Sequence, residues 1–473
     1  MGRHSFFTLG LRLASLFHSR ATSLLLFFLS VLSFHPLAWA DGFRNPFHDA
    51  AAIGQGNAFR AQADNPSALF YNQAGMTQLP GIQHSVGFQL VSPNTTFTAP
   101  SGTTVDNKIE GGLVGFPPPG QVFFTAHLGE WFPRYFDRVW AGLGMLNLFG
   151  FANQYPNNSP FANVITRGQL PLISITPSVA VRLSDWLAVG LGAKIFTFWS
   201  LLGEGHNEAQ SIALGNISGT TAGDKLELNG KGTTAGFDVS FLLTPLRNDM
   251  GQPLMNVAFI WRSQAVLPLN GALLDNGRKV ADVKTALRFP EGYEWGLAFW
   301  PLRTSAHELK LEVDVTWTRW SSIRDFHIFL SNGGVILQPQ FWDDAVTVDT
   351  GFEYKWLHPP SSPDWEYTFR MGYNHSEAAI VDQNFNPLAP DSNVHGLTIG
   401  FGALCEDRGL FLGIFQCGKS GEGLLVRQAL GIDLFYMVLL WEPRTVTGHP
   451  FPGVNGTYKT RTHVGGLTFR INF

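Results

Sequence analysis

The strongest limit on how this chain folds is a strict alternation of polar and apolar residues in segments of about ten, the length of a membrane-crossing strand. From Lys310 to Thr318 every even position is polar or charged, and every odd position is apolar or aromatic. Successive side chains of a β-strand lie on opposite faces, so this period of two predicts a strand with one polar and one apolar face. The segments 345–356 and 365–379 show the same alternation.

Composition indicates which environment the apolar faces meet. Only 14% of the 473 residues are charged, against roughly 25% in an ordinary soluble domain. After residue 40 no apolar run approaches the ~20 residues that a spanning helix requires, which excludes a polytopic helical membrane protein. The 51 glycines and 28 prolines favour turns between strands. We therefore predict an all-β chain, and its formal charge of −4 indicates no nucleic-acid partner.

Residues 1–40 have the three parts of a secretory signal peptide. They carry three arginines and no acid, then the apolar run Leu24–Phe34, then Ala38-Trp39-Ala40 with small residues at the cleavage positions. We expect cleavage before Asp41; the alternative, a membrane anchor, needs a longer apolar run.

Export favours a closed barrel over a soluble sandwich, although both show the same period of two. Lipid cannot satisfy the backbone groups at the edge of an open sheet, so a sheet that crosses a membrane must close on itself. This predicts a multi-pass β-barrel in the bacterial outer membrane, in contact with the lipids of that membrane.

Fourteen segments predict a fourteen-stranded antiparallel barrel over residues 82–473. They are 82–98, 109–127, 137–150, 167–183, 186–203, 224–244, 254–270, 283–301, 307–328, 345–356, 365–379, 394–404, 427–441 and 457–473. An even count returns both ends of the wall to one side, and short turns alternate with long connections such as 204–223 and 380–393. The last residue, Phe473, is typical of the signal read by the bacterial barrel-assembly machinery; the alternative is an ordinary edge strand.

Residues 41–81 break the alternation. The segment is rich in alanine and glycine, which suit short helices and tight turns. The lumen of a fourteen-stranded barrel is too wide for side chains alone to fill, so we predict that this segment is a plug inside it. The alternative is a periplasmic extension.

Several motifs, taken in their order and spacing, resemble one known family. They are Asp41-Gly42-Phe43, the segment from Asn65 to Met76, the stretch from Leu311 to Ile323, Phe341-Trp-Asp-Asp344, and Phe369-Arg-Met-Gly-Tyr373 followed by Pro390-Asp391-Ser392. Nearly the whole chain resembles the FadL/TodX outer-membrane transporters of long-chain fatty acids and other hydrophobic compounds. The resemblance implies a fourteen-stranded barrel with an N-terminal hatch. We expect a monomer that moves ligands inward by diffusion, without a cofactor.

The resemblance also assigns roles to individual residues. Phe43 is expected to insert into the ligand pocket, as the family's matching aromatic does. Family members release ligand sideways at a kinked third strand, and here Gly142 and Gly144 leave one face of that strand bare; the alternative is that they make room for the plug. The family's hatch usually reads Asn-Pro-Ala, whereas this chain has Asn72-Gln73-Ala74. Without the proline's fixed φ, we expect the Asn72 amide to hold this turn as a hinge.

Inward charges predict ion pairs that hold the plug, because unpaired charge in a packed lumen is costly. A few basic residues could instead receive a carboxylate, and we single out Lys194, Arg262 and Arg288. A fatty acid requires an apolar slot and one cation, whereas an aromatic hydrocarbon requires only the slot. Fatty-acid uptake is the leading interpretation; uptake of aromatic hydrocarbons and a general diffusion porin are the alternatives. The inward charges are Lys194, Asp238, Arg262, Arg288, Glu294, Lys310, Glu312, Asp314, Asp349, Glu353, Lys355, Arg370 and Arg470.

The remaining motifs do not predict catalysis or a metal site. Cys405 and Cys417 are the only cysteines, and an oxidising compartment favours a disulfide between them. Two thiols without a nearby histidine cannot fill the four positions of zinc. Gly413–Ser420 matches a phosphate-binding pattern, but it lies between barrel strands, so we treat the match as chance. No catalytic motif occurs, and a barrel lipase or protease with a site built from distant strands is the alternative.

Overall fold

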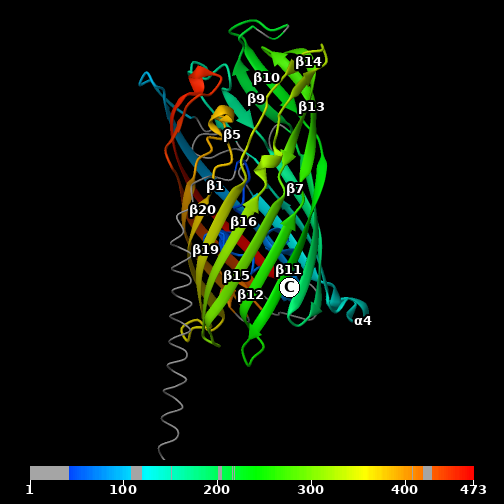
Figure 1. The fold of residues 1–473 in the computed structure, drawn as a ribbon. Coiled ribbons are helices and arrows are strands. Elements are labelled where there is room, and N and C mark those ends of the chain that lie inside the picture. The colour runs from blue at the N-terminus through cyan, green and yellow to red at the C-terminus, as the bar shows by residue number, and fades with distance from the viewer. Residues whose placement is uncertain are drawn as a thin grey trace, which may run out of the picture. The chain divides into compact units, whose positions relative to one another are not determined.

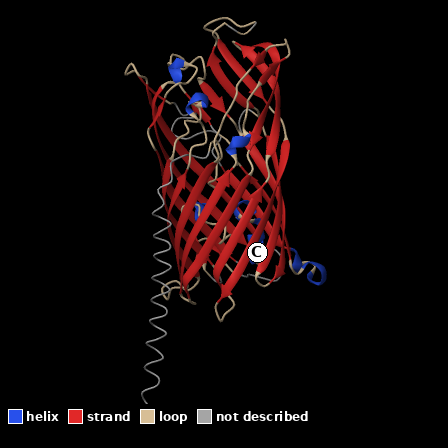
Figure 2. Ribbon diagram, viewed as in Figure 1, coloured by secondary structure: helices blue, strands red, loops and turns tan. Residues whose placement is uncertain are grey.

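The computed structural model describes residues 42–107, 120–150, 152–200, 205–215, 217, 219–406, 409–418 and 429–473. Antiparallel strands dominate the described part, with a few short helices among them (Figures 1 and 2). No helix within these ranges is both long and apolar enough to cross a membrane. The predicted signal peptide, residues 1–40, lies outside the described residues.

Fourteen strands form a closed antiparallel barrel, as predicted. β1 pairs with β26 from Gln83↔Asn472 to Thr98↔Thr457, which joins the first strand of the wall to the last. In order around the wall, the strands are β1 (Ile82–Thr98), β3 (Gly120–His127), β4 (Val139–Leu146), β7 (Leu172–Ser184), β8 (Leu187–Phe198), β11 (Thr234–Arg247), β12 (Pro253–Arg262), β15 (Gly292–Arg303), β16 (His307–Thr318), β19 (Ala345–Leu357), β20 (Trp365–Ser376), β21 (Val394–Cys405), β24 (Ala429–Trp441) and β26 (Gly456–Asn472).

The alternation in the sequence corresponds to the two faces of the wall. On β16 the even positions Lys310, Glu312 and Asp314 are at most 1% exposed and face the lumen. Outward positions carry large apolar side chains, and aromatic rings gather toward both ends of the wall. Among these are Trp186, Phe237, Trp295, Trp356, Tyr367 and Tyr436, all exposed.

A second, eight-stranded sheet continues beyond the long-loop end of the barrel (Figure 1). It consists of β5 (Ala152–Gln154), β6 (Arg167–Gln169), β9 (Asn207–Ile212), β10 (Lys225–Gly230), β13 (Ala265–Asp275), β14 (Arg278–Phe289), β17 (Ile328–Leu330) and β18 (Val335–Ile336). Five predicted strands were therefore wrong in extent, because each combines strands or parts of strands of both sheets: 167–183, 224–244, 254–270, 283–301 and 307–328. The alternation persists across the boundary, since strands of the second sheet also have one buried and one exposed face.

Residues 42–81 lie inside the barrel as a plug. They contain the short helices α2 (Ala50–Ile53) and α3 (Ala68–Tyr71) and the 3-10 helix η1 (Gln73–Gln78). The plug approaches the wall so closely that glycine is required at the contact. At Gly56, where φ is +71°, a Cβ would lie 2.5 Å from the Thr350 carbonyl oxygen, and a Cβ on Gly372 would lie 2.2 Å from the Gly56 nitrogen.

The smaller described elements connect the wall strands. They are β2 (Thr104–Asp106), η2 (Leu128–Glu130), α4 (Pro133–Phe136), η3 (Trp320–Ser322), η4 (Asp382–Asn384), β22 (Leu410–Phe411), β23 (Phe415–Gln416), β25 (Arg444–Val446) and η5 (Pro452–Val454).

Candidate ligand-binding site

The plug is tied to the wall by buried ion pairs centred on Arg60. Its Nε lies 2.5 Å from Glu294 Oε2, and its Nη1 lies 2.8 Å from Asp349 Oδ2 and 3.2 Å from Asp314 Oδ2. The same Asp314 oxygen accepts hydrogen bonds from the backbone amides of Phe59 and Arg60. These contacts reach three wall strands, β15, β16 and β19, so the plug cannot shift at this point without separating buried charges.

Two of the predicted ligand cations, Lys194 and Arg262, converge on one wall acid. Lys194 Nζ lies 2.7 Å and Arg262 Nη1 lies 2.8 Å from Asp238 Oδ2. Arg262 also contacts Glu294 at 2.5 Å and donates to the Phe70 carbonyl of the plug at 2.7 Å. Both cations are therefore already paired, which agrees with the structural role expected of most inward charges.

Lys194 and Arg262 nevertheless line a small cavity of 30 Å³, together with several phenylalanines, Arg44 and Asp238. The buried rings of this lining belong to Phe70, Phe149, Phe196 and Phe289. Arg288, the third candidate, is not beside them: it lies on β14 in the second sheet, half-exposed and 3.8 Å from Asp325.

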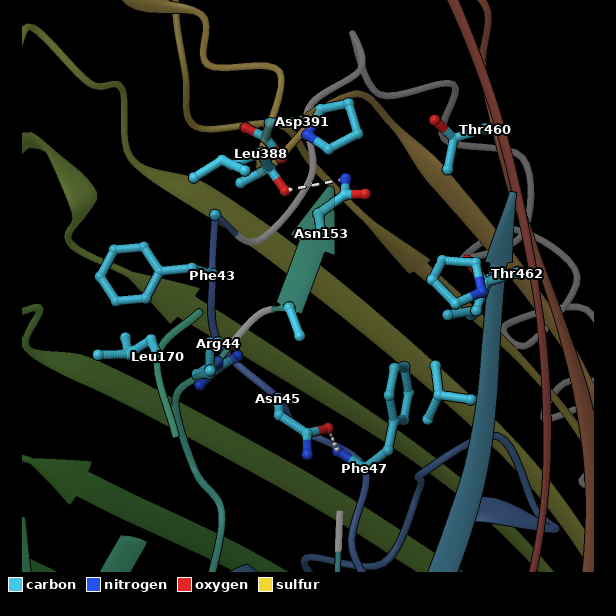
Figure 3. A pocket seen from close by; sticks show the side chains of 18 of the residues that line it. Phe43, Arg44, Asn45, Phe47, Asn153, Leu170, Leu388, Asp391, Thr460 and Thr462 are labelled. Carbon is cyan, nitrogen blue, oxygen red and sulfur yellow. Dashed lines mark hydrogen bonds between the residues drawn. The ribbon is translucent and has the colours of Figure 1, made fainter. Parts of the chain in front are cut away.

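Two larger cavities lie next to each other and share part of their lining. The inner cavity, of 330 Å³, is bounded by the start of the plug and by inward residues of β1, β24 and β26 (Figure 3). The outer cavity, of 320 Å³, is bounded by the second sheet and the loops around Trp342, and aliphatic side chains dominate it. The residues common to both linings are Phe43, Leu170, Leu388 and Ala389.

Phe43 therefore stands between the two cavities. Its ring is 8% exposed, with ring-centroid distances of 5.2 Å to Trp320, 5.7 Å to Phe149 and 5.9 Å to Trp342. Backbone hydrogen bonds hold it there, because Gly150 N donates to the Phe43 carbonyl and Asn45 N donates to the Leu148 carbonyl. A ligand that spans both cavities must contact or displace this ring.

The predicted hinge, Asn72-Gln73-Ala74, connects the plug to β8 and β11. Asn72 Oδ1 accepts from Ala74 N at 3.1 Å, while its Nδ2 donates to the carbonyls of Arg60 and Phe241. Gln73 Nε2 donates to Asp238 at 3.0 Å, so the residue in the usual place of proline makes its own bond to the wall. Ala74 N lies 3.0 Å from Ser240 Oγ.

The two glycines of the third strand lie against the plug and a neighbouring ring. A Cβ on Gly142 would lie 2.6 Å from Leu69 Cδ2, and one on Gly144 would lie 3.0 Å from the Phe123 ring. β4 keeps its ladder with β3 and β7 at both positions. The strand leaves the wall after Leu146, and its continuation bridges the plug at Arg44↔Phe149. A lateral gate here stays a prediction.

Cys405 and Cys417 form a disulfide, with their Cα atoms 5.8 Å apart. It encloses the hairpin β22–β23, part of the connection between β21 and β24. The described part of the phosphate-motif match, 413–418, lies in this hairpin, and 419–420 lie outside the described residues. Phe473 follows β26 and donates its backbone amide to the Ile82 carbonyl at the start of β1.

The comparisons with known proteins agree with this architecture. Residues 31–407 match the family described as outer membrane protein transport protein (OMPP1/FadL/TodX). The chain belongs to this family. A Neisseria meningitidis serogroup B protein, named as an outer membrane protein, is 30% identical over 122 residues. That match covers 25% of this chain and only 25% of the relative.

Solved structures of the family share the fold at low sequence identity. A Pseudomonas aeruginosa FadL homologue has a TM-score of 0.68 at 16% identity, over 92% of this chain and 100% of that chain. The toluene transporter TbuX of Ralstonia pickettii has a TM-score of 0.56 at 14% identity, over 90% and 98%. TodX of P. putida gives the same values. These likenesses establish the outer-membrane barrel fold and leave the ligand open.

Sequence reasoning missed most of the residues that line the cavities. Trp320 and Trp342 pack on Phe43, yet both appeared only as parts of family-like motifs. Four leucines of the outer cavity come from β10 and β13, which the prediction merged with wall strands. A signal was present at Trp342, which lies between the predicted strands 307–328 and 345–356, because a large aromatic ring in a connection is costly to expose. Trp320 gave no such signal, since the prediction placed it within a strand.

Proposed function

We propose that this protein takes up elongated hydrophobic molecules, long-chain fatty acids foremost, through the two cavities that meet at Phe43. The observation that carries the proposal is the shared lining of Phe43, Leu170, Leu388 and Ala389. An extended alkyl chain uses both volumes, whereas a compact aromatic hydrocarbon uses one. Apolar lining supplies most of the binding free energy for such a chain, at roughly 25 cal/mol per Å² of buried apolar area.

Lys194 is our proposed partner for a carboxylate head. It lies beside the phenylalanine-lined cavity, and it forms an ion pair with Asp238. Arg262 is less available, because Asp238, Glu294 and the Phe70 carbonyl already hold it.

We infer a route from the long-loop end toward the plug. The turns at the other end are short, as between β7 and β8 and between β15 and β16, which supports a periplasmic location for that end. Within the described residues, β3 and β4 are the shortest wall strands, with eight residues each. Sideways release beside them, where β4 bridges the start of the plug, is the exit that we propose.

A ligand series with one matched variant tests this function. Purified protein is titrated with fatty acids from octanoate to oleate, with oleyl alcohol and with toluene. We expect affinity to rise with chain length, and Lys194→Gln to weaken oleate binding roughly tenfold while oleyl alcohol is unaffected, because only oleate carries a charge. Tighter binding of toluene than of oleate would contradict the proposal and favour the aromatic hydrocarbon alternative.

A further inference from the structure

Three basic residues occupy successive outward positions near the long-loop end of β26. Lys459, Arg461 and His463 are exposed, while the alternate residues Thr460, Thr462 and Val464 face the inner cavity. Strands on the opposite side of the barrel end differently, since the outward positions of β12, β15 and β16 carry the rings of Trp261, Tyr293 and Trp317. β26 thus interrupts the aromatic girdle with positive charge.

These bases lie along a groove on the outer surface of the wall. The groove, of 630 Å³, is also lined by Ser92 and Asn94 of β1 and by Leu440 of β24. Ser92 pairs with His463 and Asn94 pairs with Arg461 across the β1–β26 ladder, so hydroxyl and amide groups stand beside the cations. The lining combines charge with hydrogen-bonding groups, as a phosphate site does.

A break in the wall ladder forms one side of the groove. β24 pairs with β26 up to Leu440↔Arg461, and pairing resumes at Arg444↔Tyr458 of β25. Between them, Glu442 N donates to the Asn393 carbonyl, and Pro443 has no amide hydrogen to donate. The segment 441–443 therefore steps away from β26 beside Lys459.

The two permanent charges lack protein partners in the described part of the chain. There, neither Lys459 nor Arg461 has a carboxylate within 4 Å of its charged nitrogens. The acids closest in the strand register are engaged elsewhere. Asp106 accepts from Thr96 Oγ1 at 2.6 Å, and Glu442 contacts the Asn393 and His395 side chains.

The neighbouring outward residues place the groove at the edge of the hydrocarbon layer. Toward the other end, β1 continues outward with Val86, Phe88 and Leu90, and β26 with Leu467 and Phe469. Charges deep in that layer would cost several kcal/mol, and the unpaired backbone of the ladder break adds to the cost. Lys459 and Arg461 therefore lie at the height of lipid headgroups.

We propose that this groove binds the phosphorylated headgroup of the glycolipid that forms the outer leaflet of bacterial outer membranes. Arg461 can bind a phosphate through two parallel hydrogen bonds, and Lys459 adds a compact positive charge. The acyl chains then lie along the apolar strip below, on β1 and β26. The proposal rests on the inferred orientation of the barrel and needs no transported ligand.

The test uses purified full-length protein and lipid A as the probe, with dephosphorylated lipid A as the matched ligand control. The variant Lys459→Gln/Arg461→Gln removes both permanent charges. The control variant Arg278→Gln/Lys284→Gln removes one arginine and one lysine from exposed positions of β14. A charge-preserving exchange, Lys459→Arg/Arg461→Lys, checks that the barrel tolerates changes here.

We expect the first variant to bind lipid A about 25-fold more weakly than wild type, at roughly fivefold for each lost charge. The β14 control and the charge-preserving exchange should bind within about twofold of wild type, and dephosphorylated lipid A should bind weakly to all four proteins. Equal binding of both lipids, or an unchanged affinity in Lys459→Gln/Arg461→Gln, would overturn the proposal. Displacement of lipid A by equimolar oleate would also overturn it. These outcomes do not depend on whether the protein transports fatty acids.

Discussion

Phe43 carries the most specific expectation at the scale of single residues. Its ring is buried against Trp320, Phe149 and Trp342 and lines both cavities. Phe43→Ala should weaken the binding of long fatty acids roughly tenfold, since about 1.5 kcal/mol of apolar contact is lost. The increase of affinity with fatty-acid chain length, measured by calorimetry, should become smaller, because the two cavities become one.

The control for Phe43 is Phe59→Ala. Phe59 is another buried ring of the plug, packed on Tyr71 and absent from the lining of both cavities. Its removal loosens plug packing without removing a ligand contact. If Phe43→Ala binds fatty acids of all chain lengths as wild type does, Phe43 is not part of the binding site.

Asn72 is the residue whose loss should loosen the plug. Asn72→Ala removes the side-chain donor to the Arg60 and Phe241 carbonyls, which costs about 1–3 kcal/mol for each carbonyl left unsatisfied. It also removes one acceptor of Ala74 N, which keeps its bond to Ser240 Oγ. Leak of small polar solutes through the variant should rise, as measured by liposome swelling. Thr77→Ala is the control, because its lost bond to the Ala74 carbonyl stays within the plug. If Asn72→Ala neither raises the leak nor alters hydrophobic uptake, the assignment of Asn72 as a hinge is refuted.

Gln73→Pro restores the proline that the family usually has in this turn and tests whether it stabilises the plug. Asn72 is extended (φ −166°, ψ 102°), which suits a residue before proline, and Gln73 begins η1. Proline restricts the unfolded chain and gains about 0.4–1 kcal/mol. Loss of the Gln73–Asp238 bond offsets this gain by about 1 kcal/mol.

The comparison that isolates the proline effect is with Gln73→Ala, which loses the same bond without the gain. Resistance of the plug to proteolysis should rank Gln73→Pro above Gln73→Ala and close to wild type. The reverse order would show that the proline ring does not fit this turn.

At the scale of elements, the sequence predicted the wall well and the region beyond it poorly. Lipid on one side and a polar plug on the other impose the alternation, so strands such as β19, β20 and β21 were recognised with nearly correct limits. Strand ends near β13 and β14 were lost, because the second sheet imposes a similar two-faced pattern. The cavities could not be predicted, since their linings join loops distant in sequence, such as 164–170, 326–342 and 380–389.

The bridge between β4's continuation and the plug should control ligand release. Arg44 and Phe149 are antiparallel bridge partners, and such pairs have Cα separations suited to a disulfide. Arg44→Cys/Phe149→Cys should block fatty-acid uptake when oxidised, while oleate binding persists. Reduction should restore uptake.

The control pair for this cross-link is Val313→Cys/Thr350→Cys, which joins β16 to β19 within the uninterrupted wall. Oxidation of this control pair should leave uptake unchanged. Reduction of the same variant controls for any effect of opening the native Cys405–Cys417 disulfide. Full uptake by the variant with an oxidised cross-link between positions 44 and 149 would show that ligand release does not require movement at this bridge.

At the scale of the whole molecule, closure of the barrel and anchoring of the plug belong together. The β1–β26 ladder leaves no free edge in the wall, and Arg60 connects the plug to acids on three strands. We expect a closed wall with an anchored plug to block the flow of water and ions, and we propose that the apolar cavities admit hydrophobic molecules. This combination distinguishes our account from a general diffusion porin.

Planar-bilayer conductance tests that central claim most directly. Wild-type protein should show little steady ion current, although vesicles that contain it bind oleate. Arg60→Ala, which leaves three buried carboxylates short of a partner at a cost of several kcal/mol, should raise the current by freeing the plug. A large, steady open channel in the wild-type protein would contradict the account and indicate a porin.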